Sequence, residues 1–149
     1  MKTIFRPVRF GTCLGTGVLA FAQVLQAHDC TLSDAAGRYG YTSTGSIVSP
    51  PVGLFTAVGH VRFNETGTFT GAQTTSIAGN LVDEAIQGTY TVNPDCTGSA
   101  TVYVYHGSTL ARISRINLVW DLHQSEVHAI FLTPGTNISI AARKMNAED

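Results

Sequence analysis

Residues 88–105 decide the fold and read Gly-Thr-Tyr-Thr-Val-Asn-Pro-Asp-Cys-Thr-Gly-Ser-Ala-Thr-Val-Tyr-Val-Tyr. Thr89–Val92 and Ala100–Tyr105 are rich in β-branched and aromatic residues, which suit the pleated, half-buried surface of a strand. The segment between them contains Asn, Pro, Asp and Gly, which are typical of a sharp turn. The stretch therefore predicts two strands joined by a turn that carries Cys96.

From Gly37 onwards the chain repeats this pattern of short apolar or alternating runs separated by glycine and polar residues. Alternation between apolar and polar positions is expected where one face of a strand is buried. One helical turn is expected near Ser33–Ala36. Further strands are expected at Arg38–Val48, Leu54–Phe63, Thr68–Ala78, Leu81–Gln87, Leu110–Leu122, Glu126–Thr133 and Asn137–Ala142.

About eight strands with glycine turns, and no convincing helical period beyond the amino-terminal segment, indicate an all-β protein. A sandwich and a closed barrel both fit such a pattern. The succession of hairpins favours the barrel, because closure removes exposed strand edges. We therefore predict a single antiparallel barrel, a meander of about eight strands.

The amino-terminal segment has the layout of a secretory signal peptide. Three basic residues within the first nine positions precede the uncharged run Phe10–Leu25, and cleavage fits after Ala22 or after Ala27. A membrane anchor is the alternative, but the run is short and contains several glycines and threonines. We expect a signal peptide at residues 1–27, a barrel domain at residues 28–149, and a secreted or periplasmic protein without a membrane span.

Removal of that segment leaves six Lys and Arg against ten Asp and Glu, a formal net charge of −4. Nucleic-acid backbones are bound by clustered basic residues, which an acidic chain with scattered cations does not offer. We therefore expect no nucleic-acid partner.

Cys30 and Cys96 remain after removal of the signal peptide. Two cysteines in an exported domain most often form a disulfide, and a loop of this length would gain about 4 kcal/mol from closure. A thiol pair used for redox chemistry or metal binding is the alternative, which no C-x-x-C spacing supports.

Several motifs stand out along the chain, namely Cys30, Gly37-Arg-Tyr-Gly-Tyr41, Ala57-Val-Gly59, Gly67-Thr-Phe69 and Gly88-Thr-Tyr-Thr-Val-Asn-Pro-Asp-Cys-Thr-Gly-Ser99. Their combination resembles a group of small exported proteins, mostly bacterial and without an assigned activity. The resemblance implies export, a disulfide and a β-barrel, and it brings no catalytic residues. More distantly, the strand order is similar to the calycin-like barrels of allene oxide cyclase and dirigent proteins, which steer cyclisation or coupling of apolar molecules.

The hairpin after Leu122 gathers the most conspicuous polar cluster. If Gln124-Ser125 is a two-residue turn, His123 faces Glu126 and Asp121 faces His128, all on one side of the sheet. Such a cluster could bind zinc or copper, or supply an acid–base pair. The simpler interpretation is a solvated hairpin tip, and we favour it.

A second metal hypothesis rests on His28, which cleavage after Ala27 would place at the mature amino terminus. The terminal amine and the imidazole together can chelate copper, with His60, His106, His123 or His128 as a further ligand. Cleavage after Ala22 would remove this arrangement. We expect no cofactor.

Tyr39, Tyr41, Tyr90, Tyr103, Tyr105 and Trp120 are the candidate ligand-binding residues. Paired strands could place several of them inside the barrel as an apolar lining with hydroxyl groups. The simpler interpretation, which we favour for most of them, is that they are ordinary strand residues.

No nucleophile motif is present, and we interpret Asp83-Glu84 as a solvated acidic pair. Asn64 and Asn137 lie in glycosylation sequons, which matter only in a eukaryotic secretory route. We expect a barrel that binds a small hydrophobic molecule or a surface partner. The alternatives are a cyclase- or isomerase-like enzyme acting on an apolar molecule, and a copper-binding protein that uses His28.

Overall fold

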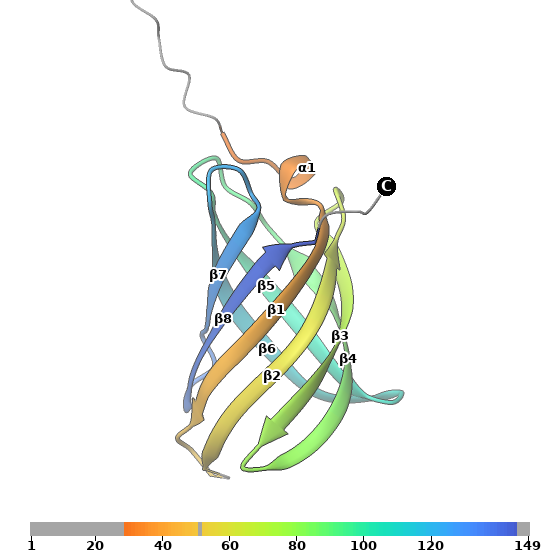
Figure 1. Cartoon of the computed structure of the whole chain (residues 1–149), viewed down its shortest axis with the longest axis vertical. Helices are drawn as coiled ribbons and strands as arrows, with labels where there is room; N and C mark the ends of the chain where they lie inside the picture. Colours follow the sequence, from red (N-terminus) through yellow and green to blue (C-terminus); the bar gives the residue numbers. More distant parts are fainter. Residues whose placement is uncertain (1–28, 51, 146–149) are drawn as a thin grey trace, which may run out of the picture.

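The computed structural model describes residues 29–50 and 52–145. One short helix precedes eight strands: α1 (Leu32–Ala35), β1 (Gly37–Ile47), β2 (Gly53–Phe63), β3 (Thr68–Ile77), β4 (Asn80–Tyr90), β5 (Thr97–His106), β6 (Thr109–Trp120), β7 (Glu126–Phe131) and β8 (Thr136–Lys144). Each strand pairs antiparallel with its neighbours in the sequence, and β1 pairs with β8 to close the barrel (Figure 1). The predicted all-β meander barrel is confirmed.

Side chains alternate between the interior and the exterior of the barrel, as the sequence predicts. On β2, Phe55, Ala57, Val61 and Phe63 are buried on the inner face. The alternate residues of the same strand are exposed on the outer face, namely Leu54, Thr56, Val58, His60 and Arg62. The apolar face of each strand therefore supplies the core, and no second layer is needed to cover it.

An aromatic cluster fills the end of the barrel that lies next to α1. The ring of Phe63 lies 5.4 Å from that of Tyr39, 5.5 Å from that of Phe69 and 4.6 Å from that of Tyr90. Gly88 leaves space for this packing, since a Cβ there would lie 2.7 Å from the Phe69 ring. The cluster closes this end of the interior with apolar contacts.

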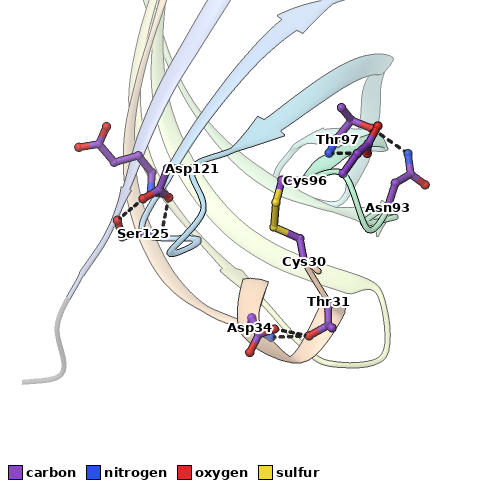
Figure 2. Close-up of a disulfide and its surroundings, with 10 residues drawn as sticks. Cys30, Thr31, Asp34, Asn93, Cys96, Thr97, Asp121 and Ser125 are labelled. Carbon is purple, nitrogen blue, oxygen red and sulfur yellow. Dashed lines mark hydrogen bonds between the residues drawn. A yellow bond between two sulfur atoms is a disulfide. The ribbon is translucent and has the colours of Figure 1, made fainter. Parts of the chain in front are cut away.

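The helix α1 covers the same end and is tied to the barrel (Figure 1). Figure 2 shows the disulfide between Cys30, just before α1, and Cys96, in the β4–β5 turn. The hydroxyl of Tyr39 lies 3.0 Å from the carbonyl oxygen of Ala35. The predicted disulfide is confirmed, and it fixes the segment that caps the barrel.

The predicted register of the β6–β7 hairpin is wrong. Trp120 pairs with Val127, so the connection is longer than the expected two residues. The Asp121 carboxylate accepts hydrogen bonds from the backbone N–H groups of Ser125 (2.6 Å) and Glu126 (2.7 Å). Figure 2 shows Asp121 beside Ser125. This acceptor stabilises a five-residue loop, residues 121–125, because the side chain binds backbone N–H groups that have no strand partner there.

Two predictions fall outside the described residues: the signal peptide at residues 1–27 and the copper ligand His28. Within residues 29–50 and 52–145, no helix has the length and apolar character needed to cross a membrane.

Candidate functional site

A partly open cavity of about 70 Å³ lies inside the barrel. All strands except β4 contribute at least two of its lining residues, and most of the lining is aliphatic or aromatic. Its polar lining residues are Tyr41, Ser43, Gln73, Arg112 and Ser114. An apolar cavity with a few polar groups is the usual form of a small-molecule site.

A buried ion pair lies beside this cavity. The side chain of Glu84, on β4, is 1% exposed, and that of Arg112, on β6, is 29% exposed. Arg112 donates from Nη2 to Oε2 of Glu84 at 2.7 Å and from Nη1 to Oε1. This two-fold contact is the geometry in which guanidinium and carboxylate bind most strongly.

Three further side chains donate hydrogen bonds to the same carboxylate. Gln73 Nε2 and Thr75 Oγ1, both on β3, lie 2.6 Å and 2.7 Å from Oε2. His106 Nε2 lies 2.9 Å from Oε1 and is the donor, because an ionised carboxylate can only accept. Tyr41 extends the network by donating to Gln73 Oε1 at 2.6 Å.

These contacts set the charge states inside the barrel. Burial alone would raise the pKa of Glu84, but hydrogen bonds from Arg112, Gln73, Thr75 and His106 outweigh it and lower the pKa to about 2. Burial, together with the Glu84 charge, raises the pKa of Tyr41 above its ordinary value. At neutral pH the network therefore holds an ionised carboxylate and a protonated phenol.

The register explains why these side chains meet. Gln73 pairs with Gly59 on one side and with Glu84 on the other, and Gly59 also pairs with Tyr41. A Cβ at Gly59 would lie 2.4 Å from the Ala72 carbonyl oxygen and 2.7 Å from Gln73 Cβ. Glycine at this position leaves the space through which Tyr41 reaches Gln73.

The two ends of the barrel differ. The end next to α1 is closed by the aromatic cluster, whereas Phe55 and Phe131, whose rings are 6.3 Å apart, line the cavity towards the opposite end. In the sequence, the four loops at that opposite end contain no Lys, Arg, Asp or Glu. Exposed apolar side chains lie in or beside these loops, namely Val48, Val52, Leu54, Leu81 and Leu132.

The six candidate ligand-binding residues take three different positions. Tyr41 lines the cavity. Tyr39, Tyr90 and Trp120 are buried in the aromatic cluster near α1 and are absent from the cavity lining. The remaining two, Tyr103 and Tyr105, alternate with the cavity-lining valines of β5 and belong to its outer face.

The polar cluster considered as a metal or acid–base site on the β6–β7 hairpin, on the assumption of a two-residue turn, is not assembled. Asp121 binds backbone N–H groups of its own loop, and His123 lies within that loop. His128 pairs with Val119 rather than with Asp121. Among the described residues, no three His, Cys, Asp or Glu side chains are arranged to hold a metal ion.

The interpretation of Asp83-Glu84 as a solvated pair is wrong for Glu84, which is buried. The sequence does contain a signal for this position, because Glu84 lies two residues before the apolar Ile86 on β4. Residues two apart on a strand share a face, so Glu84 points inwards with Ile86. Arg112 shows the same signal, in phase with Ser114 and Ile116 on β6. Their pairing could not be read from the sequence, because they lie on strands that flank β5 and do not pair with each other.

Comparison of the chain with protein-family models, with curated proteins and with solved structures found no match.

Proposed function

We propose that the protein binds a small, mainly apolar molecule inside the barrel. The observation that carries this proposal is the cavity of about 70 Å³, with its aliphatic and aromatic lining and a few polar groups. Burial of apolar ligand surface in such a cavity supplies the affinity, and the polar groups orient the ligand. The uncharged, apolar loops at the end opposite α1 suit the passage of such a molecule.

The volume limits the size of the ligand. A cavity needs roughly 10–15 Å³ to hold one water, and an engineered apolar cavity of about 150 Å³ holds benzene. A cavity of about 70 Å³ is therefore suited to a molecule of a few carbon atoms. A longer chain would have to extend past Phe55 and Phe131 towards solvent.

Binding is favoured over acid–base catalysis by the state of Glu84. Its two oxygens already accept hydrogen bonds from Arg112, His106, Gln73 and Thr75, and its pKa is about 2. A general base works best with a pKa near the working pH and with an oxygen free to reach the substrate proton. Glu84 has neither property, so the cyclase- or isomerase-like alternative would have to act by shape alone.

The test compares two alanines on adjacent strands that face opposite ways. Ala129, on β7, is buried and lines the cavity, whereas Ala141, on β8, is exposed. Ala129→Leu should fill the cavity and weaken binding of a five-carbon alcohol at least tenfold in an NMR titration. Ala141→Leu should bind like the unchanged protein. Absence of binding to the unchanged protein, or equal affinity of both variants, would reject the proposal.

We also propose that the chain is exported. The Cys30–Cys96 disulfide supports this, because structural disulfides persist mainly in oxidising compartments. Native mass spectrometry of the protein from its own source would give the mature amino terminus. A chain that starts after Ala22 or Ala27 supports export, and retention of residues 1–22 would reject it. Bound copper on a chain that starts at His28 would instead favour the copper-binding alternative.

A further inference from the structure

We propose that Glu84 makes the cavity select neutral, oxygen-bearing ligands over anionic ones, by cancelling the charge of Arg112. The ligand class is then a small alcohol, ketone or aldehyde rather than a carboxylate. This inference rests on the proposed binding function and specifies the ligand for the same cavity.

The first step is the placement of the two charges. Arg112 lines the cavity, whereas Glu84 lies behind it and is almost completely buried. Arg112 uses one N–H of each Nη atom for Glu84. A guanidinium has five N–H donors, so three remain after this contact. A ligand oxygen beside Arg112 can therefore still find a donor.

The second step is the net charge that a ligand meets. Glu84 is ionised at neutral pH, and its contact with Arg112 leaves the pair with no net charge. A ligand carboxylate would be attracted by Arg112, but it would also be repelled by Glu84 just behind it, whose Oε2 lies 2.7 Å from Arg112 Nη2, so the repulsion offsets much of the attraction. It would also lose its hydration on entering an apolar cavity, which costs far more for an ion than for a neutral group.

The third step concerns the other polar groups of the network. His106 and Tyr41 are its remaining titratable members, and Tyr41 keeps its proton. Ser114, on the same strand as Arg112, adds a neutral hydroxyl to the lining. Neutral donors and acceptors beside a compensated arginine match a hydroxyl or carbonyl oxygen. Tyr41 and Ser114 themselves carry no positive charge that would attract an anion.

The experiment compares three ligands with equal carbon number, 1-pentanol, 2-pentanone and pentanoate, by NMR titration at one fixed pH. The unchanged protein should bind the alcohol and the ketone at least tenfold more tightly than pentanoate. Glu84→Gln leaves the Arg112 charge uncompensated with little change in side-chain size. This variant should bind pentanoate at least tenfold more tightly than the unchanged protein does.

The double variant Glu84→Gln/Arg112→Gln removes both charges and serves as the matched control. It should gain no affinity for pentanoate, and its affinity for 1-pentanol should fall several-fold because the guanidinium donors are lost. This second result tests the inference even if the single variant does not fold. Equal binding of pentanol and pentanoate by the unchanged protein would overturn the inference and leave the binding function intact. Failure of all three ligands to bind would overturn the binding function itself.

Discussion

Arg112 on β6 binds Glu84 on β4 across the intervening strand β5, with Nη2 2.7 Å from Oε2. The two side chains meet inside the barrel, where the wall curves and brings strands that are not neighbours close together. The pairing of β5 with β6 shifts register between Val104 and Tyr105, close to the point where Arg112 pairs with Val104. Such irregularities bend a strand and redirect its side chains.

Loss of Arg112 should destabilise the barrel strongly. Arg112→Met leaves Glu84 as a buried carboxylate without its main partner, and removal of one member of a buried pair costs about 3 kcal/mol or more. The double variant Glu84→Gln/Arg112→Met removes both charges and should recover most of this loss. Urea denaturation would measure both free energies of unfolding. A double variant as unstable as Arg112→Met would contradict the explanation.

Stability should fall as the pH is lowered from 5 towards 2. The pKa of Glu84 is about 2 in the folded protein, against an ordinary value of 4.5. The folded state therefore gains stability above pH 4.5, and this gain is lost as the pH falls through the folded-state pKa. For a shift of this size the contribution is about 3 kcal/mol.

Other carboxyl groups with lowered pKa values, Asp95 and Asp121, contribute to the same acid transition. The Glu84 part is isolated by comparison with Glu84→Gln, which lacks the titrating group. Urea unfolding at intervals between pH 2 and pH 7 should give a shallower dependence for the variant. Parallel curves for the two proteins would contradict the assignment.

The strands could be predicted because alternation is a local signal that barrel closure does not change. Phe55 and Phe63, for example, lie inside as their spacing predicts. The β6–β7 register could not be predicted in the same way, because it depends on the Asp121 carboxylate, which binds two backbone N–H groups. The pairing of Glu84 with Arg112 could not be predicted either, because the phase of each residue on its strand indicates an inward position but not the partner that it meets across β5.

Asp121 should stabilise its loop through side-chain acceptors rather than through charge alone. Its carboxylate accepts from Ser125 N at 2.6 Å, Glu126 N at 2.7 Å and Ser125 Oγ at 2.9 Å. Asp121→Ala should cost about 1–2 kcal/mol in thermal or urea unfolding. Asp121→Asn keeps one acceptor oxygen and should cost clearly less. Equal losses for the two variants would show that the negative charge dominates.

The disulfide should matter more for the cap than for the barrel wall. Replacement of Cys30 and Cys96 by alanine should lower the free energy of unfolding by about 4 kcal/mol, as expected for closure of so long a loop. Hydrogen exchange should then increase first at α1, because its remaining ties are a few hydrogen bonds, such as Tyr39 to Ala35, and the packing of Leu32 and Ala35.

Exchange in the central strands should change only with global stability, since the ladder that closes β1 on β8 does not involve either cysteine. Reduction of the unchanged protein should reproduce the same pattern and serves as the control. If α1 and the strands lost protection to the same extent, the cap and the wall would unfold as one unit. The disulfide would then stabilise the whole barrel and not only the α1 segment that caps it.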